Sequence, residues 1–276
     1  MKKIFLFPAL LLFIFTNCEK VVDIEVPSTT PKLIIDAVFE VYFTEIPIRV
    51  NTVVKLSKSA DYFDEAIPAV TNAVVFITNL SDNSIIDFSD ANGDGNYIPI
   101  STFIPVENVV YELTIVYENN TYKGTASRVK STPLTSVIQG DKTLFSGNET
   151  ELKVAFTDDG TEENFYLFDF SNKLFLTIQD RFFNGSEYNF SYYYGEDDIK
   201  LPTTVSVKMS GVSKEFYTYY RVLIDQSGQN SGGPFETVPS SLLGNMINTS
   251  YESKFPLGYF HISETDSISL NLIEKN

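Results

Sequence analysis

Residues 109–122, with the sequence VVYELTIVYENNTY, carry the clearest structural signal in this chain of 276 residues. The odd-numbered positions hold apolar or aromatic side chains, namely Val109, Tyr111, Leu113, Ile115 and Tyr117. Alternation with a period of two predicts a strand with one buried face. The polar step at 118–121 then reverses the chain, and residues 122–128 form the expected second strand. The segment is therefore predicted to be an antiparallel hairpin.

Runs of the same kind recur along the chain and are bounded by Asn, Asp, Gly and Pro. They lie at residues 33–39, 74–77, 152–156, 166–170, 174–178, 205–209 and 268–272. Only residues 213–224 have clear helical spacing, with Phe216, Tyr219, Tyr220 and Leu223 on one face. We expect a mainly β protein: an N-terminal immunoglobulin-like antiparallel sandwich, then a second antiparallel β domain with one covering helix.

The first residues have the pattern of a secretory signal. Lys2 and Lys3 precede an apolar run over 4–15, which ends in Phe15-Thr16-Asn17-Cys18. A bilayer-spanning helix needs about 20 apolar residues, so this run is too short to be one. We expect residues 1–17 to be removed and Cys18, the only cysteine, to be acylated. The alternative is a soluble secreted protein, because Asn17 departs from the small residue usual before a lipidated cysteine.

The chain after this leader divides into three parts. Residues 18–31 are charged and contain proline, as in a tether. Residues 32–131 match an immunoglobulin-like sandwich in size, and residues 132–276 form the second domain. The boundary falls at 130–133, where a polar step ends in Pro133.

Acidic residues dominate the mature chain. Removal of residues 1–17 leaves 259 residues and takes away two of the 20 basic side chains. The mature chain then has 18 basic and 36 acidic residues, and its formal net charge is −18. A surface of this charge repels nucleic acid and anionic lipid. We therefore expect no nucleic-acid partner, and membrane contact through the lipid anchor alone.

Residues for catalysis are scarce. His261 is the only histidine, and it lies in an aromatic, strand-like run without a nucleophile motif. We interpret it as a structural or surface residue and expect no enzyme activity. The acidic clusters at 158–159, 162–163 and 196–198 are interpreted as solvated turns.

Residues 90–96, with the sequence DANGDGN, resemble the first half of a calcium loop. Asp90, Asn92 and Asp94 would supply oxygen ligands at alternate positions. The twelfth position is Ser101, where such a loop has a bidentate glutamate. A tight hairpin turn is the favoured alternative, with Asn and Gly at positive φ. We expect no cofactor here, with calcium as the competing interpretation.

Several segments in order resemble one family. Residues 158–166 (DDGTEENFY) resemble its strand entry, residues 180–185 its acidic turn, and residues 216–220 (FYTYY) its aromatic helix. Three further segments follow in the order that the family has them, at residues 233–239, 244–247 and 257–260. The start of the mature chain at 18–23 also resembles that of the family. The chain thus resembles a Bacteroidota lipoprotein family described as domain of unknown function 4249.

This resemblance implies a role at the outer membrane, because members of the family are commonly associated with TonB-dependent transporters. The leading hypothesis is a non-catalytic, lipid-anchored accessory or ligand-capturing partner of such a transporter. Which face of the outer membrane holds it stays open. Phe235, Tyr251 and Phe255 are the candidate partner-binding residues, since aromatic anchors among polar residues are typical of interfaces. A surface adhesion or carbohydrate-binding lipoprotein is the alternative, and a hydrolase comes third.

Overall fold

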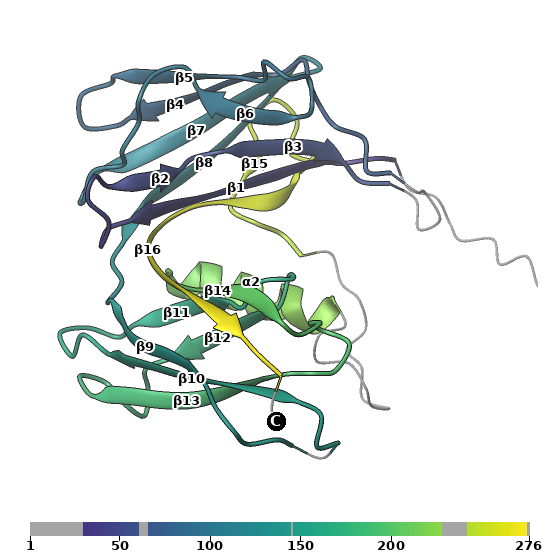
Figure 1. The fold of residues 1–276 in the computed structure, drawn as a ribbon. Coiled ribbons are helices and arrows are strands. Elements are labelled where there is room, and N and C mark those ends of the chain that lie inside the picture. Colours follow the sequence, from purple (N-terminus) through teal and green to yellow (C-terminus); the bar gives the residue numbers. More distant parts are fainter. Residues whose placement is uncertain (1–29, 61–65, 145, 228–241, 275–276) are drawn as a thin grey trace, which may run out of the picture.

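The computed structural model describes residues 30–60, 66–144, 146–227 and 242–274, and it is mainly β (Figure 1). The expected fold class, a β protein with one helix, is confirmed for this part of the chain. The predicted leader, Cys18 and Phe235 lie outside the described residues. No helix in the described ranges is long and apolar enough to span a bilayer.

The first group of strands surrounds one core. Its members are β1 (Leu33–Tyr42), β2 (Arg49–Asn51), β3 (Val54–Lys58), β4 (Val74–Asn79), β5 (Ile85–Ser89), β6 (Asn96–Pro99), β7 (Val110–Tyr117), β8 (Asn120–Val129), β15 (Ile247–Asn248) and the first part of β16 (Leu257–Leu272). Their pairings follow the order β16-β1-β3-β6-β5-β4-β7-β8, and β8 pairs again with β16. The strands therefore form a closed ring of successive pairings.

The second group forms two facing sheets. Its elements are β9 (Leu134–Gln139), β10 (Thr150–Thr157), β11 (Phe165–Asp169), β12 (Phe175–Gln179), β13 (Glu187–Tyr194), β14 (Thr203–Gly211) and α2 (Lys214–Gln226). One sheet has the order β12-β11-β14-β16, and the other has the order β13-β10-β9. All pairings within this group are antiparallel, as expected.

Strand β16 belongs to both groups, and Figure 1 shows it curving from one to the other. It pairs with β1 in parallel and with β14 in antiparallel fashion. The parallel pairing of β1 with β16 is an exception to the antiparallel pairings that dominate the sheets, and it joins residues far apart in the sequence. Gly258 is required in this pairing, because it has a φ of +98° and an added Cβ would collide with the carbonyl of Ile35.

Three clusters of buried apolar side chains result among the described residues: the two larger ones are the cores of the two strand groups, and the third joins β11 to α2. The first extends from Leu33 to Tyr122 and also includes Met246, Phe260 and Ile262. These three side chains fall within the range 132–276 that the sequence assigned to the second domain. The second core begins at Leu134 and ends at Leu272. The segment 130–133 thus separates the cores, while β16 contributes to both.

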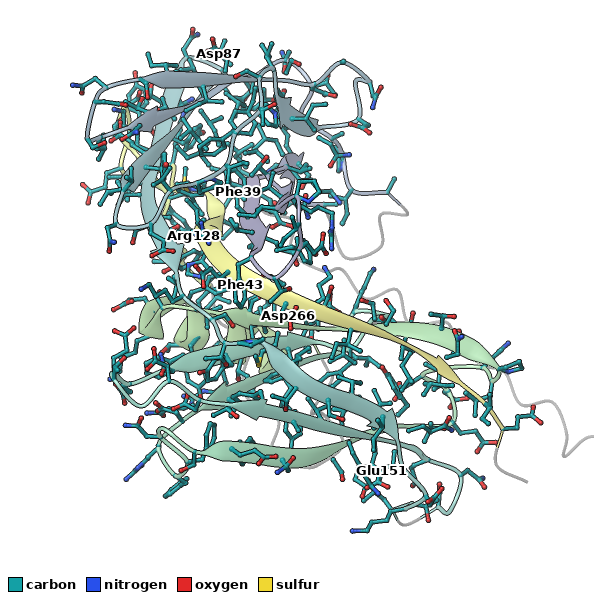
Figure 2. The ribbon with its side chains drawn as sticks, turned by 60° about the vertical axis from the view of Figure 1, so that its left-hand side comes forward. Phe39, Phe43, Asp87, Arg128, Glu151 and Asp266 are labelled. Atoms are coloured by element: carbon teal, nitrogen blue, oxygen red, sulfur yellow. The ribbon has the colours of Figure 1, made fainter. Side chains whose placement is uncertain are left out.

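Buried polar contacts join the two groups along β16 (Figure 2). Arg128 of β8 forms a salt bridge of 2.8 Å with Glu264, whose carboxylate also accepts a hydrogen bond from the Ser131 amide. Asp266 accepts hydrogen bonds from Thr44 in the first group and from the Leu134 amide in the second. These charge-assisted bonds fix the relative position of the groups.

The local predictions agree with the structure at three places. Strands β7 and β8 form the predicted hairpin, with Glu118 and Asn119 at positive φ in a two-residue turn. Strands β5 and β6 pair across the 90–96 turn. The predicted helix is α2, which begins after its N-cap Ser213.

Candidate functional site

A cavity of about 830 Å³ lies between the two groups of strands. One wall is the outer face of β1 with the start of β16, and the other is formed by α2 with β11, β12 and β14. Figure 1 shows α2 between the strands of the first core and those of the second. We refer to this cavity as the aromatic cleft.

Strand β1 supplies one wall of the cleft, because its side chains point alternately to its two faces. Its odd-numbered residues from Leu33 to Val41 point into the first core, and Ile35, Ala37, Phe39 and Val41 are fully buried there. The even-numbered Ile34, Asp36, Val38 and Glu40 therefore lie on the opposite face and line the cleft. Two carboxylates are thereby placed among aliphatic side chains.

Helix α2 supplies the aromatic wall. The side chains of Phe216, Tyr219 and Tyr220 line the cleft together with Tyr259 of β16. The ring centroids of Phe216 and Tyr219 both lie 4.9 Å from that of Tyr259, and the centroid of Tyr220 lies 5.3 Å from that of Phe175 on β12. Such tilted and edge-to-face contacts are favourable, so the rings are held in place. The Leu223 side chain on the predicted apolar face remains 39% exposed, so it is less buried than expected.

The tyrosine hydroxyls stay protonated at neutral pH. Burial raises the pKa of Tyr219 to about 12, and the negative charge of Asp36 adds to this effect. Burial also raises the pKa of Tyr220, again with a contribution from Asp36. Both hydroxyls can therefore donate hydrogen bonds to a ligand near Asp36.

A charged network crosses the cleft. The Lys208 ammonium on β14 lies 2.9 Å from Glu40 on β1 and 3.6 Å from Asp169 at the end of β11. Glu40 also accepts hydrogen bonds from the Tyr42 hydroxyl and the Asn51 amide. Burial alone would lower the pKa of Lys208, but Glu40 outweighs this effect and the pKa is raised. Lys208 is therefore charged, and it ties the two walls together.

Asp36 differs from these carboxylates. It lies exposed to the solvent of the cleft, and it takes part in none of the salt bridges among the described residues. Desolvation by the surrounding protein raises the pKa of Asp36, and the opposing effects of Lys55 and of a hydrogen bond with the Val38 backbone are smaller. Asp36 is thus a carboxylate whose charge the protein only partly compensates.

His261 lies behind this wall and does not line the cleft. Its side chain is buried, and its ring is stacked on Phe216 with centroids 4.3 Å apart and an interplanar angle of 5°. The Nε2 atom has no hydrogen-bond partner among the described residues. Burial lowers the pKa of His261 to about 3, against the raising effect of a backbone hydrogen bond with Gly211. The ring is therefore neutral at physiological pH and supports the Phe216 side chain.

Of the predicted partner-binding residues, the structure describes Tyr251 and Phe255, and neither lines the cleft. Tyr251 is 59% exposed in the loop before β16. Phe255 lies beneath Lys32, whose ammonium is 3.4 Å from its ring centroid. Lys32 itself lines the cleft, so Phe255 is next to its edge. The structure leaves Tyr251 as an exposed aromatic side chain of the kind an interface uses.

The 90–96 segment has the geometry of a turn. The two carboxylate oxygens of Asp90 accept hydrogen bonds from the amides of Asp94 and Gly95, and Asp94 accepts one from the Asn96 amide. Asn92 is exposed at the tip. Gly95 has a φ of +81°, and a Cβ there would lie 2.6 Å from the Leu56 carbonyl oxygen. No metal-holding group of three or more His, Cys, Asp or Glu residues was found in the described ranges.

The residues of the cleft are not among those predicted from the sequence. One signal was available in residues 33–42, where Asp36 and Glu40 alternate with Ile34 and Val38 on a single strand face. Apolar side chains on both faces of a strand are typical of a strand that is covered on both sides. The coverage of this face by α2 depends on pairings between distant residues, which no local pattern specifies.

The comparisons with known proteins identify a family. The family model described as "Domain of unknown function (DUF4249)" matches residues 19–269, which is most of the chain. No match was found among the curated proteins. The match includes every element that lines the aromatic cleft. The chain belongs to the DUF4249 family of proteins.

Proposed function

We propose that this protein is a non-catalytic, lipid-anchored protein of the outer membrane that captures a ligand in the aromatic cleft. In this proposal it acts as an accessory partner of a TonB-dependent transporter. The observation that carries the proposal is the cleft itself, with its aromatic wall and a few polar groups. Its volume of about 830 Å³ is within the range of small-molecule sites, about 300 to 1,000 Å³.

The rigidity of the cleft supports a capturing role. Its walls belong to the two strand groups, which are held together by the Arg128–Glu264 salt bridge, by Asp266 and by Lys208. A site formed before the ligand arrives needs little ordering when the ligand binds. Binding then costs less conformational entropy than it would between mobile domains.

The proposed anchor at Cys18 explains how such a protein would find a transporter. A lipidated protein searches in the plane of the membrane, which raises its effective concentration near a membrane partner. Even a small interface then suffices for complex formation. Tyr251 is the described aromatic residue that we assign to this interface.

Copurification of the native protein tests the partnership. The tagged chain would be expressed in its own host, solubilised in mild detergent, and the proteins that accompany it would be identified. We expect an outer-membrane transporter with the wild type, and much less with Cys18→Ala. Recovery of no transporter, under conditions that preserve other lipoprotein complexes, would favour the adhesion or carbohydrate-binding alternative.

A further inference from the structure

We propose that the ligand of the aromatic cleft is an organic cation, whose ammonium or guanidinium group lies against the Asp36 carboxylate and the rings of Tyr219 and Tyr220. This inference rests on the ligand-capturing role proposed above and specifies the chemistry of the ligand. It follows from the position of one carboxylate within an aromatic wall and from the charge of the whole lining.

The three carboxylates of the cleft are satisfied to different degrees. Glu40 receives hydrogen bonds from Lys208, Tyr42 and Asn51, and Asp169 is near Lys208 and accepts a hydrogen bond from the Ser171 amide. The charged form of Asp36 is stabilised only by the charge of Lys55 and by a backbone hydrogen bond with Val38. Lys55 lies opposite it on β3, beyond salt-bridge distance. A ligand cation would supply the partner that Asp36 lacks within the described residues.

The aromatic wall next to Asp36 suits the same ligand group. Asp36, Tyr219 and Tyr220 line the same cleft, and the negative charge of Asp36 contributes to the raised pKa values of both tyrosines. A cation between a carboxylate and the face of an aromatic ring gains from both, and the gain is larger in a desolvated site. Phe216 and Tyr259 extend the apolar surface for the rest of the ligand.

The charge of the lining favours a cation over an anion. Three acidic residues, Asp36, Glu40 and Asp169, line the cleft with two basic ones, Lys32 and Lys208. Lys208 is already engaged by two of the acids, and Lys32 lies over the ring of Phe255. The formal net charge of the chain, −16, adds a long-range preference of the same sign. A positively charged ligand is therefore favoured both by the lining of the cleft and by the charge of the whole chain.

Calorimetric titration of the full-length protein in mild detergent tests this assignment. The probes are trilysine, arginine amide and spermidine as cations, with trialanine and triglutamate as neutral and anionic counterparts, at about 150 mM salt so that long-range attraction is screened. We expect at least one cation to bind, while trialanine and triglutamate do not. Asp36→Asn should weaken that binding at least about tenfold, the worth of one charge-assisted bond.

Asp87→Asn is the matched control, because it removes one exposed carboxylate from β5, away from the elements that line the cleft (Figure 2). It should change the affinity less than about twofold, since the lost charge is screened. A thermal melt of Asp36→Asn should match or exceed that of the wild type, because the raised pKa of Asp36 means that its charged form destabilises the fold. Tyr219→Leu tests the ring and should also weaken cation binding.

The inference would be overturned by failure of all three cations to bind, or by equal weakening of cation binding by Asp36→Asn and Asp87→Asn. Binding of trialanine or triglutamate in place of the cations would also overturn it, yet would leave a capturing role intact. Loss of the transporter from the copurification would instead contradict the proposed partnership. The two proposals therefore fail separately.

Discussion

Acid should destabilise this protein through His261, and replacement by phenylalanine should remove that effect. The His261 side chain is buried against Phe216, and its Nε2 atom has no partner among the described residues. Protonation in the folded state is therefore unfavourable, and the pKa falls from 6.5 to about 3. A depressed pKa means that the unfolded chain binds the proton first, so stability is present above pH 6.5 and is lost as the pH falls toward 3.

The size of the effect follows from linkage. A change of pKa from 6.5 to about 3 corresponds to roughly 5 kcal/mol over the whole range. Between pH 7 and pH 5 the wild type should lose about 2 kcal/mol of unfolding free energy through this residue. Because His261 is the only histidine, no other side chain with an ordinary pKa near 6.5 contributes. At pH 7 His261→Phe should change the free energy of unfolding little, because it removes an unpaired polar atom along with the hydrogen bond to Gly211.

Urea denaturation at pH 7 and pH 5, followed by circular dichroism, measures this difference. Desolvation by the surrounding protein raises the pKa values of Asp36 and Asp180, so these residues act in the opposite direction as the pH falls. Both are present in the wild type and in His261→Phe, so their contributions cancel in the comparison. Equal losses of stability in the two proteins between pH 7 and pH 5 would refute the buried, neutral state of His261.

The remaining predictions concern the anchor, the turn and the joint between the cores. Cys18→Ala should abolish labelling by a fatty-acid analogue and release the protein from the membrane fraction or leave it unprocessed; equal labelling of both forms would contradict lipidation. Calcium should not raise the melting temperature, because Asp90 already binds backbone amides; an increase that chelator reverses and Asp94→Ala abolishes would establish a calcium site. Arg128→Met should lower the free energy of unfolding in denaturant by about 3 to 5 kcal/mol, because it leaves the Glu264 carboxylate buried without its cation. The double variant with Glu264→Gln should recover part of this loss. An unchanged free energy of unfolding in Arg128→Met would show that the salt bridge is not needed.

Features set by neighbouring residues could be predicted from the sequence. The hairpin of β7 and β8, the turn at 90–96 and helix α2 each follow from a local pattern of apolar, turn and capping residues. Their partners lie within a few residues along the chain. Local signals of this kind decide secondary structure whatever the tertiary arrangement is.

The aromatic cleft could not be predicted in the same way. It depends on the parallel pairing of β1 with β16, where Ile34 is opposite Leu257, 223 positions away in the sequence. No local pattern specifies a pairing over that distance. Asp36 and Tyr219 are therefore unremarkable in the sequence, and they become a site only when β16 brings α2 onto the outer face of β1.

The most direct test of the central claim, that the cleft captures a ligand, is to identify the small molecules retained by protein purified from its own membranes. Ala60→Trp would place an indole ring at the wall of the cleft and obstruct it, because Ala60 lines the cleft and is exposed. Ala91→Trp places the same side chain on the exposed turn at 90–96. We expect the wild type and Ala91→Trp to retain the same molecule and Ala60→Trp to lose it. Retention of one molecule by all three proteins, or of none by the wild type, would contradict the claim.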